Sequence, residues 1–169
     1  MGAGSLQEIY ADELKDLWSA NDQMAKIVDV MAEKAMNSAL KDTLTQSIAD
    51  INKHAASIRE LLLDADEDAE MEHCKGMEGL VKEAAKHVTK EPPESRELLD
   101  IVIIAQYQRM SHYGLAGFGT AAAYAKALGM DEHSKKMERI VKDIHEGDKY
   151  ASLLAEHAEE VASADIAAE

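Results

Sequence analysis

Residues 64–95, DADEDAEMEHCKGMEGLVKEAAKHVTKEPPES, divide this chain of 169 residues into two parts that each carry long helical patterns. The segment opens with a run of acids that has no apolar period, and it closes near Pro92-Pro93, the only two prolines in the chain. Prolines remove a backbone donor and clash with the preceding turn, so they interrupt helices. We therefore predict one helical hairpin within residues 6–63 and a second within residues 97–162.

Apolar side chains recur every three to four residues in both hairpins, which is the period of one helix face. Residues with good capping side chains precede the four runs: Ser5, Asn37, Ser95 and Asp131. A short amphipathic helix is also predicted within residues 76–89. Because no segment alternates with a period of two, the sequence predicts an all-α fold. A long connection between the second and third long helices is typical of a ferritin-like four-helix bundle.

The composition limits the possible partners. The chain has 33 acidic and 18 basic residues, a net charge of −15, so it should repel nucleic acid and anionic membrane surfaces. No apolar run is long enough to cross a bilayer, and no signal peptide is evident. The single cysteine excludes an intramolecular disulfide and favours the cytoplasm. We expect residues 1–5 to be a disordered leader, residues 6–162 the bundle, and residues 163–169 a frayed tail.

Polar residues recur at one depth of the predicted bundle. Asp50 and His54 lie one helical turn apart beside an apolar stripe, and Asp143 and Asp148 lie at the same depth on the last helix. Inward carboxylates and imidazoles in such a layer are the ligands that helical bundles use for first-row metals. The alternative interpretation is an intrahelical Asp–His hydrogen bond and two solvated acids. The spacing alone leaves both interpretations open.

Three motifs resemble the YciE/YciF-type ferritin-like proteins, a bacterial family associated with stress responses. They are IYADELKDLWSA at residues 9–20, CKGMEGL at residues 74–80, and His112-Tyr113 followed by Phe118-Gly119-Thr120. The motifs follow the family order and span nearly the whole chain. The resemblance implies a ferritin-like bundle with a carboxylate metal site at its centre.

The same resemblance shows where this chain departs from the family pattern. The pattern implies acids at positions that here are Asn21, Ser111 and Gly114. His112, beside the two missing acids of the third long helix, is either a ligand of a remodelled site or a neutral histidine that hydrogen-bonds across the bundle. The candidate metal ligands are therefore His54, Asp50, Asp148, Asp143 and His112. A single ion, iron or another first-row divalent metal, is expected between the second and fourth long helices.

These residues favour a stress-associated protein with an eroded or remodelled metal site and a mainly structural or interaction role, rather than an enzyme. The rival hypothesis is an active dimetal iron or manganese oxidase or peroxide-consuming protein. A third is an acidic helical adaptor that binds a protein partner through residues 76–89. The third long helix has three closely spaced glycines, Gly114, Gly117 and Gly119. Because glycine is unfavourable inside a helix, they indicate that another backbone approaches this helix closely, within the bundle or across a dimer seam. We expect a two-fold homodimer.

Overall fold

The computed structural model describes the backbone of residues 2–167 and the side chains of residues 2–164. In chain order its elements are α1 (Leu6–Lys34), α2 (Ser38–Asp64), α3 (Lys75–Ala85), the π-helix η1 (Lys86–Lys90), α4 (Arg96–Ala127) and α5 (Asp131–Ala167). No strand occurs within residues 2–167, so the all-α prediction is confirmed.

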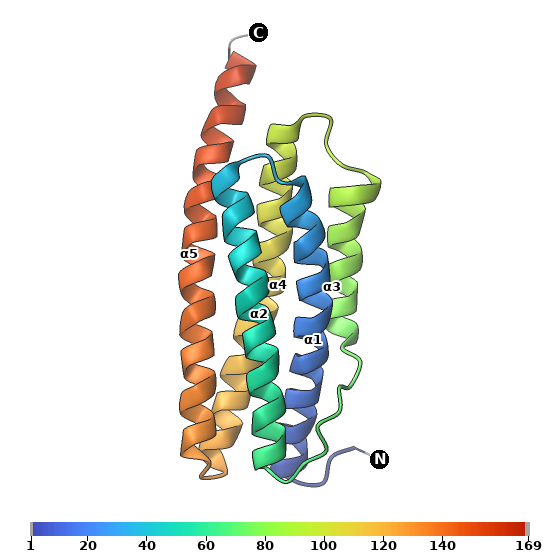
Figure 1. Cartoon of the computed structure of the whole chain (residues 1–169), viewed down its shortest axis with the longest axis vertical. Coiled ribbons are helices and arrows are strands. Elements are labelled where there is room, and N and C mark those ends of the chain that lie inside the picture. The colour runs from blue at the N-terminus through green and yellow to red at the C-terminus, as the bar shows by residue number, and fades with distance from the viewer. Residues whose placement is uncertain (1, 168–169) are drawn as a thin grey trace.

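The four long helices form two antiparallel hairpins that pack side by side (Figure 1). The connection after α2 returns along the bundle before α4 begins, so α2 and α4 run in the same direction. The short helix α3 lies outside the bundle and contacts both α1 and α4. This is the ferritin-like connectivity with one long crossover that the sequence predicts.

Three of the predicted caps begin their helices as expected. The side chains of Ser5, Asn37 and Ser95 each accept a hydrogen bond from the backbone N–H three residues further on, at 3.1–3.2 Å. Each bond satisfies one of the N–H groups that a helix start leaves without an intrahelical acceptor. Local side-chain chemistry therefore sets where α1, α2 and α4 begin.

The turn into α5 differs from the prediction that Asp131 caps it. Asp131 is the first residue of the helix, and the carbonyl of Met130 accepts the N–H of Ser134 at 3.1 Å. Gly129 has φ +75°, a left-handed conformation that glycine adopts at no steric cost, so it ends α4 and reverses the chain. Asp131 instead adds negative charge to the first turn of α5, where the helix dipole favours it.

The predicted ends of the domain fall partly outside the described residues. The helix α5 continues to Ala167, past the boundary at residue 162 that the sequence predicted. Residues 168–169 of the predicted frayed tail and residue 1 of the predicted leader lie outside the described residues. Ser5, the last residue of that leader, is the cap of α1.

A buried acid ties the α1–α2 turn to the other hairpin. Asp100, on the first turns of α4, accepts hydrogen bonds from the backbone N–H groups of Met36 and Asn37, each at 2.8 Å. Its side chain is buried, whereas Met36 and Asn37 are exposed, so both bonds lie at the edge of the core. This contact fixes one end of the first hairpin against the second.

The apolar core forms two clusters, one toward each end of the bundle. The first includes Met31, Leu44 and Ile103, and the second includes Leu14, Ile58 and Phe118. Between the two clusters each long helix contributes polar residues or glycine: Asn21 on α1, His54 on α2, Ser111 and Gly114 on α4, Asp143 and Gly147 on α5. The polar layer that the sequence predicted therefore separates two halves of the core.

The glycines of α4 meet different surroundings. A Cβ on Gly117 would lie 2.5 Å from Cδ2 of Leu17, so here α1 and α4 approach too closely for a side chain. A Cβ on Gly119 would have no neighbour within 4 Å. Close approach within the bundle thus explains Gly117, and the dimer seam stays a prediction.

Candidate functional site

A cavity of about 80 Å³ lies in the polar layer at the centre of the bundle. All four long helices and α3 contribute to its wall. Its polar or small lining residues are Ala20, Asn21, Ser47, Asp50, His54, Tyr107, Ser111, Gly114, Asp143 and Gly147, and its larger apolar ones are Leu17, Met24, Ile51, Met77, Met110, Phe118 and Ile144. The cavity therefore contains most of the positions at which the sequence predicted a metal site.

His54 is the buried imidazole of this cavity. Its side chain is 8% exposed, and its ring meets that of Phe118 edge-on, with centroids 5.9 Å apart. Nε2 lies 3.9 Å from Oδ2 of Asp143, beyond hydrogen-bond distance. Burial lowers the pKa of His54, an effect only partly opposed by the negative charges of Asp143 and Asp50. The imidazole is therefore neutral near pH 7 and can act as a nitrogen ligand.

Two carboxylates line the cavity, one from α2 and one from α5. Asp50 is half-buried, and both of its oxygens lie 3.4 Å from Nε2 of Gln46 on the same helix. Asp143 is 64% exposed on α5. The intrahelical hydrogen bond between Asp50 and His54, which was the alternative interpretation of this pair, does not form; Asp50 lies next to Gln46 instead. The two acids line the cavity from the side that faces solvent.

The positions that the family pattern assigns to acids line the same cavity without carboxylates. Nδ2 of Asn21 donates to the carbonyl of Leu17 at 2.8 Å, and Oγ of Ser111 donates to the carbonyl of Tyr107 at 3.0 Å. Gly114 contributes no side chain. The polar hydrogens of Asn21 and Ser111 are thus directed to backbone one turn earlier on the same helix, which satisfies these buried groups.

Asp148 and His112 lie together on a different surface, between α4 and α5. Oδ1 of Asp148 is 3.1 Å from Nε2 of His112 and accepts a hydrogen bond of 3.0 Å from Nε2 of Gln108. Neither Asp148 nor His112 belongs to the cavity lining. Of the five candidate ligands, the structure brings together His54, Asp50 and Asp143, and it pairs the other two separately.

These residues do not fit the metal pair that the fold implies. A ferritin-like dimetal site takes a Glu from each of two helices and a Glu-x-x-His pair from each of the others. Here the cavity offers one imidazole and two aspartates, of which Asp143 is largely exposed. Within the described residues, no group of three or more His, Cys, Asp or Glu side chains is arranged to hold a metal ion.

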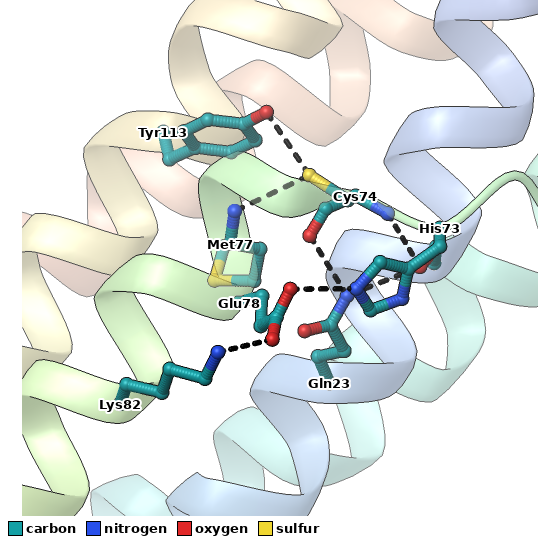
Figure 2. Close-up of polar contacts among 8 residues, drawn as sticks. Gln23, His73, Cys74, Met77, Glu78, Lys82 and Tyr113 are labelled. Atoms are coloured by element: carbon teal, nitrogen blue, oxygen red, sulfur yellow. Dashed lines mark hydrogen bonds and ion pairs between the residues drawn. The ribbon is translucent and has the colours of Figure 1, made fainter.

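The crossover is anchored to the bundle at Cys74, as Figure 2 shows. Its backbone N–H donates to Oγ of Ser19 at 3.0 Å, and its carbonyl accepts from Nε2 of Gln23 at 3.1 Å. Sγ caps α3 by accepting the N–H of Met77 at 3.3 Å and lies 3.1 Å from the hydroxyl of Tyr113. Burial raises the pKa of the Cys74 thiol, so it is a protonated structural group rather than a nucleophile.

Tyr113 links this anchor to α1. Its hydroxyl donates to Oδ2 of Asp16 at 3.1 Å, and its ring would lie 2.8 Å from a Cβ on Gly76. The close packing of the ring explains Gly76, the first of the two glycines in the CKGMEGL motif. The motif therefore docks α3 against α1 and α4, and Met77 reaches the cavity from outside the four long helices.

Like the Asp100 contact, a polar contact of His133 joins the hairpins and was missed by sequence reasoning. His133 accepts or donates at both ring nitrogens: Nδ1 is 2.9 Å from the hydroxyl of Tyr10, and Nε2 is 2.7 Å from Oδ2 of Asp64. His133 and Tyr10 are buried at the end of the bundle opposite the α1–α2 turn. His133 stands one turn before Met137 on the apolar stripe of α5, and this position was a signal that its ring faces inward.

A family model described as "Domain of unknown function (DUF892)" matches residues 5–167. The chain belongs to the DUF892 family. This member is 24% identical over 145 residues to protein YciF of Escherichia coli K12, covering 85% of the chain and 86% of YciF. The resemblance to YciF-type proteins is confirmed.

Solved structures show the same fold. The crystal structure of the E. coli stress protein YciF has a TM-score of 0.87 and 23% identity, covering 94% of this DUF892 chain and 99% of that one. YcfI from Rhodopseudomonas palustris has a TM-score of 0.83 and 23% identity, covering 88% and 93%. These similarities confirm the ferritin-like bundle. In the part of the chain that the structure describes, no helix is long and apolar enough to cross a membrane.

Proposed function

We propose that this DUF892 member is a stress-associated protein with a mainly structural or interaction role, built on a bundle whose central metal site is eroded. The observation that carries the proposal is the lining of the cavity. Asn21, Ser111 and Gly114 face the space where a metal pair would need carboxylates. The stress association rests on the similarity to YciF, which is described as a stress protein.

The small number of carboxylates in the cavity favours one bound metal ion over a pair of ions. Two divalent ions in such sites lie about 4 Å apart and repel each other strongly unless carboxylates surround them. Asp50 and Asp143 are the acids that line this cavity, and Asp143 is largely exposed. If a divalent first-row ion such as iron binds, His54 supplies the nitrogen ligand and these two aspartates the oxygen ligands. Asp148 does not enter the set, because Gln108 and His112 hold its carboxylate.

The interaction role is supported by apolar side chains on α5. Leu153 is 61% exposed and Tyr150, one turn earlier, is 47% exposed. Val161, two turns further along α5, is 43% exposed and lines a pocket with Met36 and Glu97. Exposed apolar side chains along one helix are typical of contact surfaces when they cluster. A two-fold homodimer through α5 is the assembly that this surface favours.

Paired histidine variants test the placement of the metal. We expect His54→Ala to abolish any bound iron or manganese while leaving the helical bundle folded, because the two apolar clusters carry its stability. His112→Ala is the matched control, since His112 is 60% exposed and lies outside the cavity. A His54→Ala protein that retains as much metal as the parent would contradict the placement, and two ions per chain would overturn the eroded site.

A further inference from the structure

The cavity has a second set of donors that the carboxylate pattern does not consider. Met24 on α1, Met77 on α3 and Met110 on α4 all line it, together with His54 on α2. Three residues with thioether side chains and one with an imidazole, from four different helices, therefore line a single space. Met24 is 7% exposed, Met77 is 1% exposed and Met110 is 0% exposed.

The buried oxygen donors of the cavity are neutral. Asn21 and Ser111 offer an amide and a hydroxyl oxygen, while their N–H and O–H groups donate to backbone carbonyls of their own helices. Asp143 is directed largely to solvent. The inner wall is therefore rich in soft, neutral donors and poor in hard, charged ones. That balance favours a different class of ion from the one that ferritin-like sites hold.

Thioether and imidazole ligands suit Cu(I), whereas Mg²⁺ and Mn²⁺ prefer carboxylate oxygens. A monovalent ion also needs less compensating charge, because its desolvation cost and its repulsion from neighbouring charges are smaller than those of a divalent pair. We propose that this cavity binds one Cu(I) ion through the thioethers of Met24, Met77 and Met110 and the imidazole of His54. The inference rests on the proposed loss of the carboxylate metal pair.

The size and flexibility of the site agree with this assignment. A space of about 80 Å³ exceeds the volume that a single water molecule requires, so one ion fits without displacing a helix. Methionine is unbranched and has a polarizable sulfur, so small rotamer changes can bring its thioether to an ion at the centre. Asp50 and Asp143 give the entrance a negative potential that attracts cations.

The test is an anaerobic competition for Cu(I) between the full chain and a chromogenic Cu(I) chelator. The parent should withdraw one Cu(I) per chain. Met77→Leu, Met110→Leu and His54→Ala should each weaken the affinity by at least about tenfold, the smallest loss typical of removing even a supporting group at a metal site. Leucine conserves the volume of methionine, so both methionine variants should stay folded. Circular dichroism and thermal unfolding would verify that.

Two controls separate this site from other sulfur donors. Met31 is 0% exposed in the core but does not line the cavity, so Met31→Leu should leave the Cu(I) affinity unchanged. Cys74 does not line it either, and Cys74→Ser should also keep the affinity while preserving a capping side chain. A parent that withdraws no Cu(I) would overturn the inference. So would affinity lost in Met31→Leu or Cys74→Ser but kept in Met77→Leu and Met110→Leu.

Loading the chain with Fe(II) or Mn(II) tests the eroded site separately from the Cu(I) site. A chain that does not bind Cu(I) and holds at most one divalent ion contradicts the Cu(I) site alone and agrees with the eroded site. A chain that binds two divalent ions contradicts the eroded site, whatever its Cu(I) affinity.

Discussion

Replacing Gly117 with alanine should destabilise the bundle although alanine is the better helix former. The added Cβ would lie 2.5 Å from Cδ2 and 3.3 Å from Cγ of Leu17, and 3.2 Å from Oε1 of Glu13. Carbon atoms in contact are normally about 3.5–4.0 Å apart. Leu17 is 0% exposed, so it cannot withdraw without disturbing the α1–α4 packing.

Two opposing terms set the magnitude. Alanine gains about 1 kcal/mol over glycine in a helix interior. Overpacking a buried contact costs about 1–3 kcal/mol. We therefore expect Gly117→Ala to lower the free energy of unfolding by about 0–2 kcal/mol, since the two effects partly offset. Urea unfolding followed by circular dichroism measures this directly.

Gly119→Ala is the matched control on the same helix. No atom lies within 4 Å of the Cβ it would add, so only the propensity term applies and the variant should gain about 1 kcal/mol. The two variants should then differ by about 1–3 kcal/mol, and each kcal/mol moves Tm by about 2–4 °C in a chain of this size. Equal stabilisation by both substitutions would refute the close α1–α4 approach at Gly117.

Three further predictions test the packing, the electrostatics and the assembly. Asp100→Ala should lower the free energy of unfolding by about 1.5–3 kcal/mol, because two backbone N–H groups lose an acceptor whose side chain is buried; an unchanged urea midpoint would contradict that role. Burial and then the charge of Asp16 raise the pKa of Glu13, so ionisation of Glu13 disfavours the folded state. Glu13→Gln should therefore match the parent in stability below pH 4.5, its ordinary value, and exceed it increasingly as pH rises through the raised folded pKa; a pH-independent difference would contradict this. Light scattering should give a dimer at tens of micromolar for the parent and a monomer for Leu153→Glu, and a monomeric parent would count against the dimer.

The fold could be predicted because its signals are local. Ser5, Asn37 and Ser95 cap helices within three residues of themselves, and the apolar period gives each helix its buried face. The depth of the polar layer was also predictable, since Asn21 and His54 interrupt apolar stripes at matching heights. Such patterns depend only on neighbouring positions in the chain.

Which acids line the cavity depends on how α5 is rotated about its own axis. The apolar pattern of α5 defines this rotation less well. Asp143 and Asp148 are separated by about 140° around an α-helix, so they cannot both face one cavity. Asp143 lies toward α2 and His54, whereas Asp148 turns to Gln108 on α4. Partners that lie far apart in sequence, such as Tyr10 and His133, left no local pattern beyond their place on a buried stripe.

The most direct test of the eroded metal site is the metal stoichiometry of the parent protein. Protein purified without chelator, loaded anaerobically with Fe(II) or Mn(II) and desalted, would be assayed by plasma mass spectrometry, with anomalous scattering from crystals to place any ion. We expect at most one divalent ion per chain, beside His54. Two ions per chain in the central cavity, close enough to share Asp50 or Asp143, would contradict the proposal and indicate an intact dimetal centre.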